Sequence, residues 1–334
     1  MRVIREADGE RAAPRGAVAT VGNYDGIHLG QRAVLERVVA RARQLDRPAL
    51  AITFEPHPLR VLAPERAPRR LTTDLQRLRL LEALGLDALC VLEFTPELAS
   101  WPAERFVSEL LAGRFALHEL YVGSRFAFGR GRAGSLALLE RLGAELGFRS
   151  FGVPEVEVRS EPVSATRIRS ALAAGRVEDA AELLGRPYAV DGRVVEGDRR
   201  GRSLGFPTLN LETLNEILPA DGVYVVEAEF PERGERAPGV ANVGLRPTIG
   251  RDAAPVVEAH LLDFGRECYG EEVELRFLTR LREERRFPSL PALTEQIARD
   301  VRSAREYLDA AGRSDRRSAG AGARSGPRGG ASTP

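Results

Sequence analysis

The stretch that decides the fold is residues 17–54, AVATVGNYDGIHLGQRAVLERVVARARQLDRPALAITF. It begins and ends with short apolar runs, AVATVG and ALAITF. Between them, apolar residues recur at the three- and four-residue spacing of one helix face: Val34, Leu35, Val38, Val39 and Ala42. A strand, a helix and a second strand in this order predict a βαβ unit.

The same alternation continues to about Gly185. Its further apolar segments are 75–84, 88–92, 106–111, 120–122 and 136–146. Repeated βα units predict a parallel sheet covered by helices. We therefore expect a Rossmann-like α/β domain over residues 1–185, with ligands bound at the carboxyl ends of its strands.

The pattern changes after Pro187 to short β-rich runs separated by Gly, Pro and Asp. These runs are YAVDGRVVEG, GVYVVEAEF, GVANVG, VVEAHLLDF and EVELRFL. They predict an antiparallel β-barrel over residues 186–311. A helix after Ser289 closes this domain, because apolar residues recur from Leu293 to Leu308 at helical spacing. Residues 312–334 are rich in Gly, Ser, Ala and Arg, and we expect them to be disordered.

The composition limits the classes of partner. The formal net charge is +1, and there is no lysine among the 49 basic residues. A nearly balanced charge gives no bulk attraction to nucleic acid or to an anionic membrane, so we expect small-molecule substrates. Cys90 and Cys268 lack the spacing of a zinc site or a disulfide framework, and the start of the chain has no apolar leader. We expect a cytoplasmic protein.

The turn of residues 22–31 is the first candidate site. Gly22, Asn23, Asp25 and Gly30 surround the start of the first long helix. Unpaired backbone amides and the positive end of the helix dipole suit a triphosphate there. His28 lies where an imidazolium could stabilise charge on a phosphate under attack, although a histidine at this position could simply cap the helix.

The segment GRSLGFPTLN, residues 201–210, is the second candidate site. Gly201, Gly205 and Pro207 predict a loop that lets backbone amides approach phosphate oxygens. Thr208 and Asn210 supply a hydroxyl and an amide carbonyl, which are hard oxygen ligands suited to Mg²⁺. This chemistry predicts a site for metal-bound phosphate.

A carboxylate downstream completes the set needed for phosphoryl transfer. In VVEAHLLDF, Glu258 and His260 share one face of a predicted strand, and Ala259 lies on the other. Phosphorylation of an alcohol needs an acceptor for the hydroxyl proton, and Glu258 can serve. On its own, Glu258 would be read as a surface residue of a barrel strand.

The ordered motifs resemble the family of bifunctional prokaryotic riboflavin kinase/FMN adenylyltransferases over nearly the whole chain. These motifs are GNYDGIHLGQ, TFEPHP, RLTT, VGSRFAFGRGRAG, VSATRIRSAL and FPTLNL. The resemblance implies an amino-terminal nucleotidylyltransferase with an HxGH signature, in which His28, Gln31, Ser164, Thr166 and Arg169 contact the nucleotide. It also implies that Thr208 and Asn210 form the PTxN pattern for magnesium and ATP, and that Glu258 is the kinase base.

Three residues depart from the family pattern. Gln31 replaces the second histidine of HxGH and can donate a hydrogen bond but cannot carry an imidazolium charge. Arg125 occupies a position where the family usually has Asn or Asp, and its charge could either add phosphate affinity or block the flavin phosphate. Ala165 removes one hydroxyl from an SSTxxR-like pattern.

The leading hypothesis is an enzyme that phosphorylates riboflavin with Mg·ATP and then adenylylates FMN to FAD. Its cofactor would be Mg²⁺, and its substrates and products ATP and flavins. A kinase-only enzyme is the first alternative, because Gln31, Arg125 and Ala165 permit a degenerate adenylyltransferase domain. A non-catalytic flavin-binding regulatory or storage module is the second. The sequence leaves the oligomeric state open.

Overall fold

The computed structural model describes residues 1–5, 8, 13–197, 206–246 and 254–322. The chain divides into two compact units. The first unit contains Met1–Ala174, Glu178–Tyr188 and Leu214–Ile217. The second unit contains Gly175–Val177, Ala189–Thr213 and the chain from Leu218 onward.

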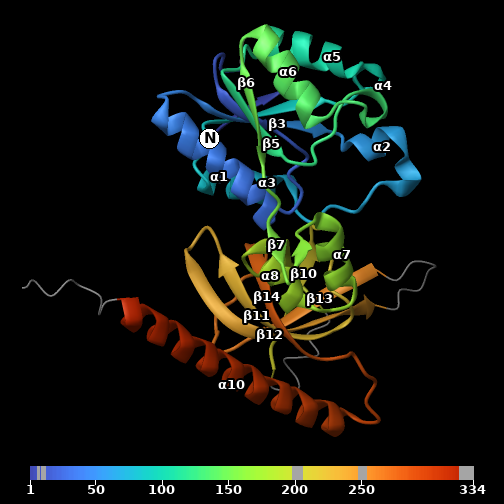
Figure 1. The fold of residues 1–334 in the computed structure, drawn as a ribbon. Helices are drawn as coiled ribbons and strands as arrows, with labels where there is room; N and C mark the ends of the chain where they lie inside the picture. Colours follow the sequence, from blue (N-terminus) through green and yellow to red (C-terminus); the bar gives the residue numbers. More distant parts are fainter. Residues whose placement is uncertain (6–7, 9–12, 198–205, 247–253, 323–334) are drawn as a thin grey trace, which may run out of the picture. The chain divides into compact units, whose positions relative to one another are not determined.

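The first unit is built on a six-stranded parallel sheet in the order β1-β4-β3-β2-β5-β6 (Figure 1). Its strands are β1 Arg2–Arg5, β2 Val18–Val21, β3 Ala49–Glu55, β4 Ala88–Glu93, β5 Glu119–Gly123 and β6 Arg149–Val153. The predicted parallel sheet is confirmed. The sequence did not predict β1, because a four-residue edge strand with two arginines carries no apolar run.

Helices cover both faces of this sheet. The helices between Leu29 and Leu184 are α1 Leu29–Gln44, α2 Pro58–Leu62, α3 Asp74–Ala83, α4 Pro96–Ser100, α5 Ala103–Arg105, the π-helical η4 Phe106–Arg114, α6 Leu136–Leu146, α7 Ala165–Ala173 and α8 Val177–Leu184. Short 3₁₀ turns span Pro64–Arg66 and Arg130–Arg132, and β7 Glu157–Val158 pairs with β8 Glu161–Pro162.

Two apolar cores hold these layers together. On one face, Leu35 and Val38 of α1 pack with Val18 and Leu89 of the sheet. On the other face, the side chains of η4 and α6 pack against β2, β3, β4 and β5. Each fully buried aliphatic side chain contributes about 1.5–3 kcal/mol, so the packing fixes the strand ends that carry the site loops.

The second unit is a closed antiparallel barrel in the order β10-β13-β12-β11-β14-β9. Its strands are β9 Tyr188–Val195, β10 Leu209–Thr213, β11 Gly222–Phe230, β12 Glu235–Arg246, β13 Ala254–Leu261 and β14 Glu272–Arg282. The predicted barrel is confirmed. The sequence placed Asn210 in a loop, whereas it lies on strand β10, because β10 is needed to join β9 to β13 and close the barrel.

The last helix, α10 Leu290–Gly322, packs on the outside of the barrel (Figure 1). Its Ala304 is fully buried in a cluster with Val223, Val225 and Val240. The helix continues to Gly322, whereas the sequence predicted disorder from Gly312; arginine and alanine favour helical backbone in this segment. Among the helices that the structure describes, none has the length and apolarity needed to cross a bilayer.

Candidate active sites

The turn after β2 forms a capped helix start. His28 is the N-cap of α1, and its Nδ1 accepts a hydrogen bond from the Gln31 backbone N–H at 3.3 Å. The Gln31 side-chain oxygen accepts one from the His28 backbone N–H, also at 3.3 Å. Gly30 leaves room for the imidazole, since a Cβ there would lie 3.3 Å from the His28 ring. Gln31 therefore closes a capping box, a role that explains its place beside His28.

Histidine 28 is electrically neutral in this setting. Burial, together with the positive charges of Arg186 and Arg169, lowers its pKa to about 4. The expected imidazolium is thus corrected to a neutral imidazole. Because Nδ1 accepts a hydrogen bond, the proton of the neutral ring lies on Nε2, which can donate to a phosphate oxygen. The sequence gave no signal for Arg186, whose guanidinium donates to the carbonyls of Gly26 and Ile27.

Asp25 joins three of the family motifs. Its Oδ1 accepts hydrogen bonds from the backbone N–H groups of Leu71 at 2.8 Å and Thr72 at 3.3 Å. Its Oδ2 pairs with the guanidinium of Arg169, whose Nε donates to the Arg69 carbonyl at 2.8 Å. The structure therefore brings the 22–31 turn, the RLTT loop and helix α7 together, with Asp25 as the common acceptor.

The SATRIR segment begins helix α7. Ser164 is its N-cap and accepts a hydrogen bond from the Arg167 backbone N–H at 3.3 Å. Ala165 and Thr166 occupy the first helical turn. Ser164 therefore caps the helix, and the first turn of α7 presents backbone amides that can meet an anion.

A small pocket opens beside the same turn. The side-chain amide of Asn23 lies 3.1 Å from His57 Nε2. Both line the pocket with Phe54, Arg70 and Thr72. No periodic signal in the sequence pointed to His57, Phe54 or Arg70; the pocket forms because the ends of β2 and β3 meet the RLTT loop.

Arg125 does not present a free charge. Its Nε donates to the Glu155 carboxylate at 2.6 Å, and the two residues follow the adjacent strands β5 and β6. Glu155 offsets the positive charge that could have drawn in or blocked a flavin phosphate. The sequence could not predict this pair, because it joins residues from two different strand ends.

In the second unit, strand register brings the predicted kinase residues together. Glu258 of β13 lies directly opposite Asn210 of β10 on one side and Asn242 of β12 on the other. Directly opposed residues share one face of a sheet and have Cβ atoms about 4.5–5.5 Å apart. Glu258 and Asn210 therefore point to the same side of the barrel wall, as phosphoryl transfer requires.

Two neighbours restrain the segment that is predicted to bind magnesium. A Cβ on Gly197 would lie 2.1 Å from Asn210 Nδ2, so only glycine leaves room for the buried amide. His260 Nδ1 donates to the Pro207 carbonyl at 2.8 Å, and its ring packs edge-on against Phe206. Gly201 and Gly205, predicted to contact the nucleotide, lie outside the described residues.

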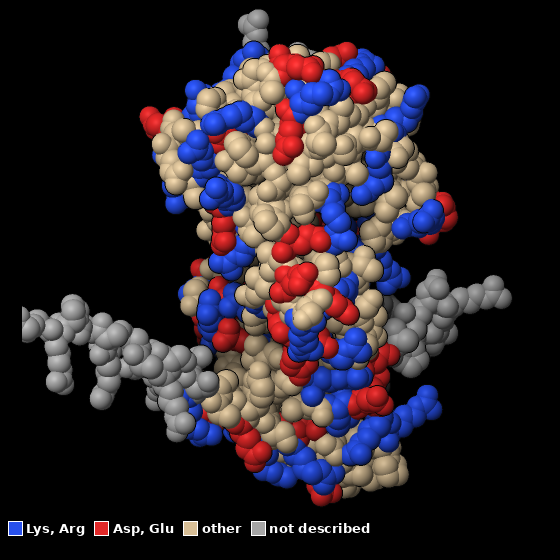
Figure 2. All heavy atoms as spheres, in the orientation of Figure 1, with Lys and Arg blue, Asp and Glu red and all other residues tan. Residues whose placement is uncertain are grey.

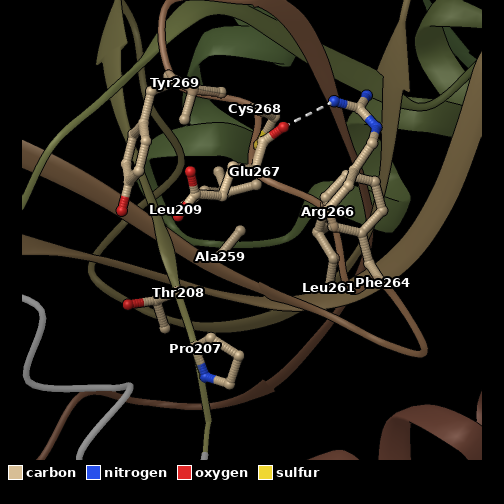
Figure 3. A pocket seen from close by; sticks show the side chains of 11 residues that line it. Pro207, Thr208, Leu209, Ala259, Leu261, Phe264, Arg266, Glu267, Cys268 and Tyr269 are labelled. Atoms are coloured by element: carbon tan, nitrogen blue, oxygen red, sulfur yellow. Dashed lines mark hydrogen bonds between the residues drawn. The ribbon is translucent and has the colours of Figure 1, made fainter.

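A small pocket of about 70 Å³ opens beside Thr208. Figure 3 shows Leu209 and Ala259 at its centre, with Thr208 and Tyr269 on one side and Arg266 on the other. Strand alternation places Leu209 and Ala259 on the opposite face of their strands from Asn210 and Glu258. The pocket thus has an apolar floor and lies beside the Thr208 hydroxyl, which is part of the predicted metal site.

The barrel carries oxygen donors on and beside one strand, and the parallel sheet carries a capped helix start suited to phosphate. Together these two features define the class of protein: an enzyme that transfers phosphorus groups from ATP. The family model of FAD synthetase matches residues 10–167, and that of riboflavin kinase matches residues 184–308. The chain belongs to the family of bifunctional riboflavin kinase/FMN adenylyltransferases.

The relatives match along nearly their whole lengths. The bifunctional riboflavin kinase/FMN adenylyltransferase of Escherichia coli (strain K12) is 39% identical over 92% of this chain and 98% of its own. The Pseudomonas fluorescens protein of the same description is 39% identical over 91% and 97%. A solved structure titled "Crystal Structure of Macrolide-efflux Protein from Streptococcus pneumoniae" is 29% identical, with a TM-score of 0.82, over 91% of this chain and 99% of that one.

Proposed function

We propose a set of residue roles for the two reactions that this family carries out. The chain phosphorylates riboflavin to FMN with ATP, and it adenylylates FMN with a second ATP to give FAD and pyrophosphate. The observation that carries the kinase assignment is the strand register that puts Asn210 directly opposite Glu258.

In the kinase reaction, Glu258 accepts the proton of the terminal ribityl hydroxyl. The hydroxyl oxygen then bonds to the γ-phosphorus of ATP, and ADP leaves. Asn242, on the strand beside Glu258, helps to hold the hydroxyl and the phosphate in line. Positioning of this kind supplies most of the catalysis in phosphoryl transfer, because little covalent chemistry falls to the protein.

Magnesium fits the donors beside Glu258. The Thr208 hydroxyl and the Asn210 carbonyl oxygen are both hard oxygen ligands. Asn210 is buried against Gly197, so its amide is held in one place before any ion binds. Bound there, Mg²⁺ would neutralise charge on the ATP phosphates.

In the adenylyltransferase reaction, an oxygen of the FMN phosphate bonds to the α-phosphorus of ATP, and pyrophosphate leaves. The neutral His28 donates a hydrogen bond from Nε2 to the phosphate under attack. The amides at the starts of α1 and α7 stabilise the charge that develops there. Gly22, Asn23 and Asp25 shape the turn, and Arg169 holds Asp25 in place.

The two alternatives gain no support from the comparisons. The relatives are described as bifunctional, and both family models match. Arg125, which could have blocked the flavin phosphate, is paired with Glu155. Gln31 retains a structural role in the helix cap. We therefore propose that both sites turn over.

We also propose a cytoplasmic setting with small-molecule substrates alone. Cys90 and Cys268 are free and buried, as in a reducing compartment. Positive and negative side chains are interspersed over the face shown in Figure 2, with no field of one sign that would favour nucleic acid.

Product analysis tests the assignment. Incubation with riboflavin and Mg·ATP, followed by chromatography, should yield FMN and then FAD. A Glu258→Gln variant should form FMN about 10²–10⁴-fold more slowly, because the proton acceptor is lost. The same variant, given FMN and Mg·ATP, should make FAD at the wild-type rate.

A Glu258→Gln variant that phosphorylates riboflavin normally would refute the proposed base. Wild-type protein that stops at FMN would instead establish the kinase-only alternative. Removal of Mg²⁺ with a chelator should abolish FMN formation, and loss of activity should be reversed by added Mg²⁺.

A further inference from the structure

The chain returns to the first unit between two barrel strands. Strand β10 ends at Thr213, and β11 begins at Gly222. Residues Leu214–Ile217, called here the 214–217 segment, belong to the same compact unit as Met1–Ala174. They nevertheless fall inside the stretch matched by the riboflavin kinase model, residues 184–308. The division of the sequence between the two family models therefore does not coincide with the division of the structure.

The 214–217 segment is bound by specific polar contacts. The Glu216 carboxylate accepts hydrogen bonds from the Arg70 backbone N–H at 2.8 Å and from the Arg60 guanidinium at 2.5 Å. The Asn215 amide donates to the Gln76 side-chain oxygen at 2.9 Å and to the Leu71 carbonyl at 3.5 Å. The bonds to the Glu216 carboxylate are charge-assisted, and those of the Asn215 amide are neutral.

These contacts fall on the loop that Asp25 holds from its other side. The backbone N–H groups of Leu71 and Thr72 donate to Asp25, and the N–H of Arg70 donates to Glu216. The backbone of residues 70–72 is therefore fixed by a carboxylate at each end. Arg70 and Thr72 line the pocket beside the phosphate-binding turn, so the position of this loop sets the shape of that pocket.

The charge state of Glu216 suits this role. Burial alone would raise the pKa of Glu216, but the Arg70 backbone N–H and the Arg60 guanidinium outweigh burial and lower it. Glu216 is therefore ionised at neutral pH and remains a strong acceptor for both donors.

We propose that Glu216 and Asn215 are positioning residues for FMN adenylylation, supplied to the adenylyltransferase site by the riboflavin kinase half of the sequence. They act through the Arg70–Thr72 loop and not by contact with the reacting atoms. The proposal rests on the adenylyltransferase assignment made above. Under this proposal, the adenylyltransferase site is not complete within residues 10–167, the stretch matched by the FAD synthetase model.

The test measures both activities, riboflavin phosphorylation and FAD synthesis, in each full-length variant. Glu216→Ala should lower kcat/KM for FMN in FAD synthesis by about 10- to 100-fold, as a misplaced site loop does, while riboflavin phosphorylation stays within about twofold. Glu216→Gln should recover part of the loss, because its oxygen can still accept from the Arg70 N–H. Leu214→Ala, an exposed neighbour in the same segment, is the matched control and should change neither activity.

Hydrogen–deuterium exchange provides a readout independent of turnover. Peptides covering residues 69–73 should exchange faster in Glu216→Ala and Asn215→Ala than in Leu214→Ala. Unchanged FAD synthesis, equal loss of both activities, or unchanged exchange in this loop would each overturn the proposal. If the wild-type protein made no FAD, the adenylyltransferase assignment would fail, and the exchange comparison alone would then decide whether Glu216 holds the loop.

Discussion

At the scale of single residues, His28 illustrates how burial changes chemistry that a motif suggests. The motif implied a charged imidazole beside a phosphate, whereas burial and two nearby arginines keep the ring neutral. Neutral imidazole is a hydrogen-bond donor at Nε2, so we expect His28 to stabilise charge on the phosphate by a directed hydrogen bond. Gln31 supports this state, because its backbone N–H occupies Nδ1.

The depressed pKa of His28 makes the first unit sensitive to acid. The unfolded chain binds a proton near pH 6.5 and the folded chain only near pH 4, so stability falls as the pH drops through this window. At pH 5 the cost is about 2 kcal/mol. We expect His28→Asn, which keeps a capping oxygen but does not titrate, to lose about 2 kcal/mol less stability than wild type between pH 7 and pH 5.

Denaturant unfolding followed by tryptophan fluorescence measures this difference. Trp101 is the only tryptophan in the chain and belongs to the first unit, so its signal reports that unit. Equal pH dependence in wild type and His28→Asn would contradict the neutral state assigned to His28. FAD synthesis should fall in the variant at every pH, because the Nε2 donor is gone.

At the scale of elements, the kinase site depends on how β13 holds the segment before β10. Asn210 is fixed by strand pairing, whereas Thr208 precedes the strand and has no ladder partner in β13. His260 supplies the missing restraint, because its Nδ1 donates to the carbonyl of Pro207. Of the two proposed magnesium ligands, Asn210 therefore lies on a strand and Thr208 lies on a tethered loop.

Substitutions at His260 should distinguish the effect of its hydrogen bond to Pro207 from the effect of its ring packing. An Asn amide can place its N–H near the position of Nδ1, whereas Gln extends further, toward the position of Nε2. We expect His260→Gln and His260→Ala to raise KM for Mg·ATP in riboflavin phosphorylation by about tenfold, the effect of one lost hydrogen bond. His260→Asn should stay close to wild type.

Steady-state kinetics with varied Mg·ATP checks this expectation, and FAD synthesis from supplied FMN serves as the control for folding. Equal effects of Asn and Gln would show that the ring acts through packing against Phe206. A change in kcat without a change in KM would also argue against a loop-positioning role.

At the scale of the whole molecule, two units carry two activities in one chain, so each activity reports the integrity of its own unit. The barrel is supported from outside by α10, through the buried Ala304 and through an ion pair between Arg282 of β14 and Asp300. The Arg282–Asp300 pair is bidentate, with N–O distances of 2.8 and 3.1 Å.

Ala304→Asp should destabilise the barrel selectively. It buries a carboxylate among Val223, Val225 and Val240, which costs about 2–5 kcal/mol when the charge is unpaired. On heating, riboflavin phosphorylation should be lost several degrees earlier than in wild type, while FAD synthesis from FMN falls only to the level of the Glu216→Ala variant and is lost fully at the wild-type temperature. Ala310→Asp, at an exposed position of the same helix, is the matched control and should shift neither.

Parallel loss of both activities in Ala304→Asp would contradict the assignment of the two reactions to separately stabilised units. Thermal inactivation curves for the two reactions, taken from one heated sample, give the comparison directly.

The sequence alone determined the architecture and the family. Apolar periodicity sufficed for the parallel sheet, the barrel and the packing of α10, because each depends on which residues must leave water. The ordered motifs sufficed for the candidate residues, including Thr208, Asn210 and Glu258. Local spacing also placed Glu258 and His260 on one face of a strand.

Only the tertiary structure decided how these residues work. Strand register set Asn210 opposite Glu258, and burial beside Arg186 made His28 neutral. The pairing of Arg125 with Glu155 and the return of Glu216 to the first unit join residues far apart in the chain. Hydrogen bonds and pKa values depend on distances between such residues, and those distances exist only once the chain has folded.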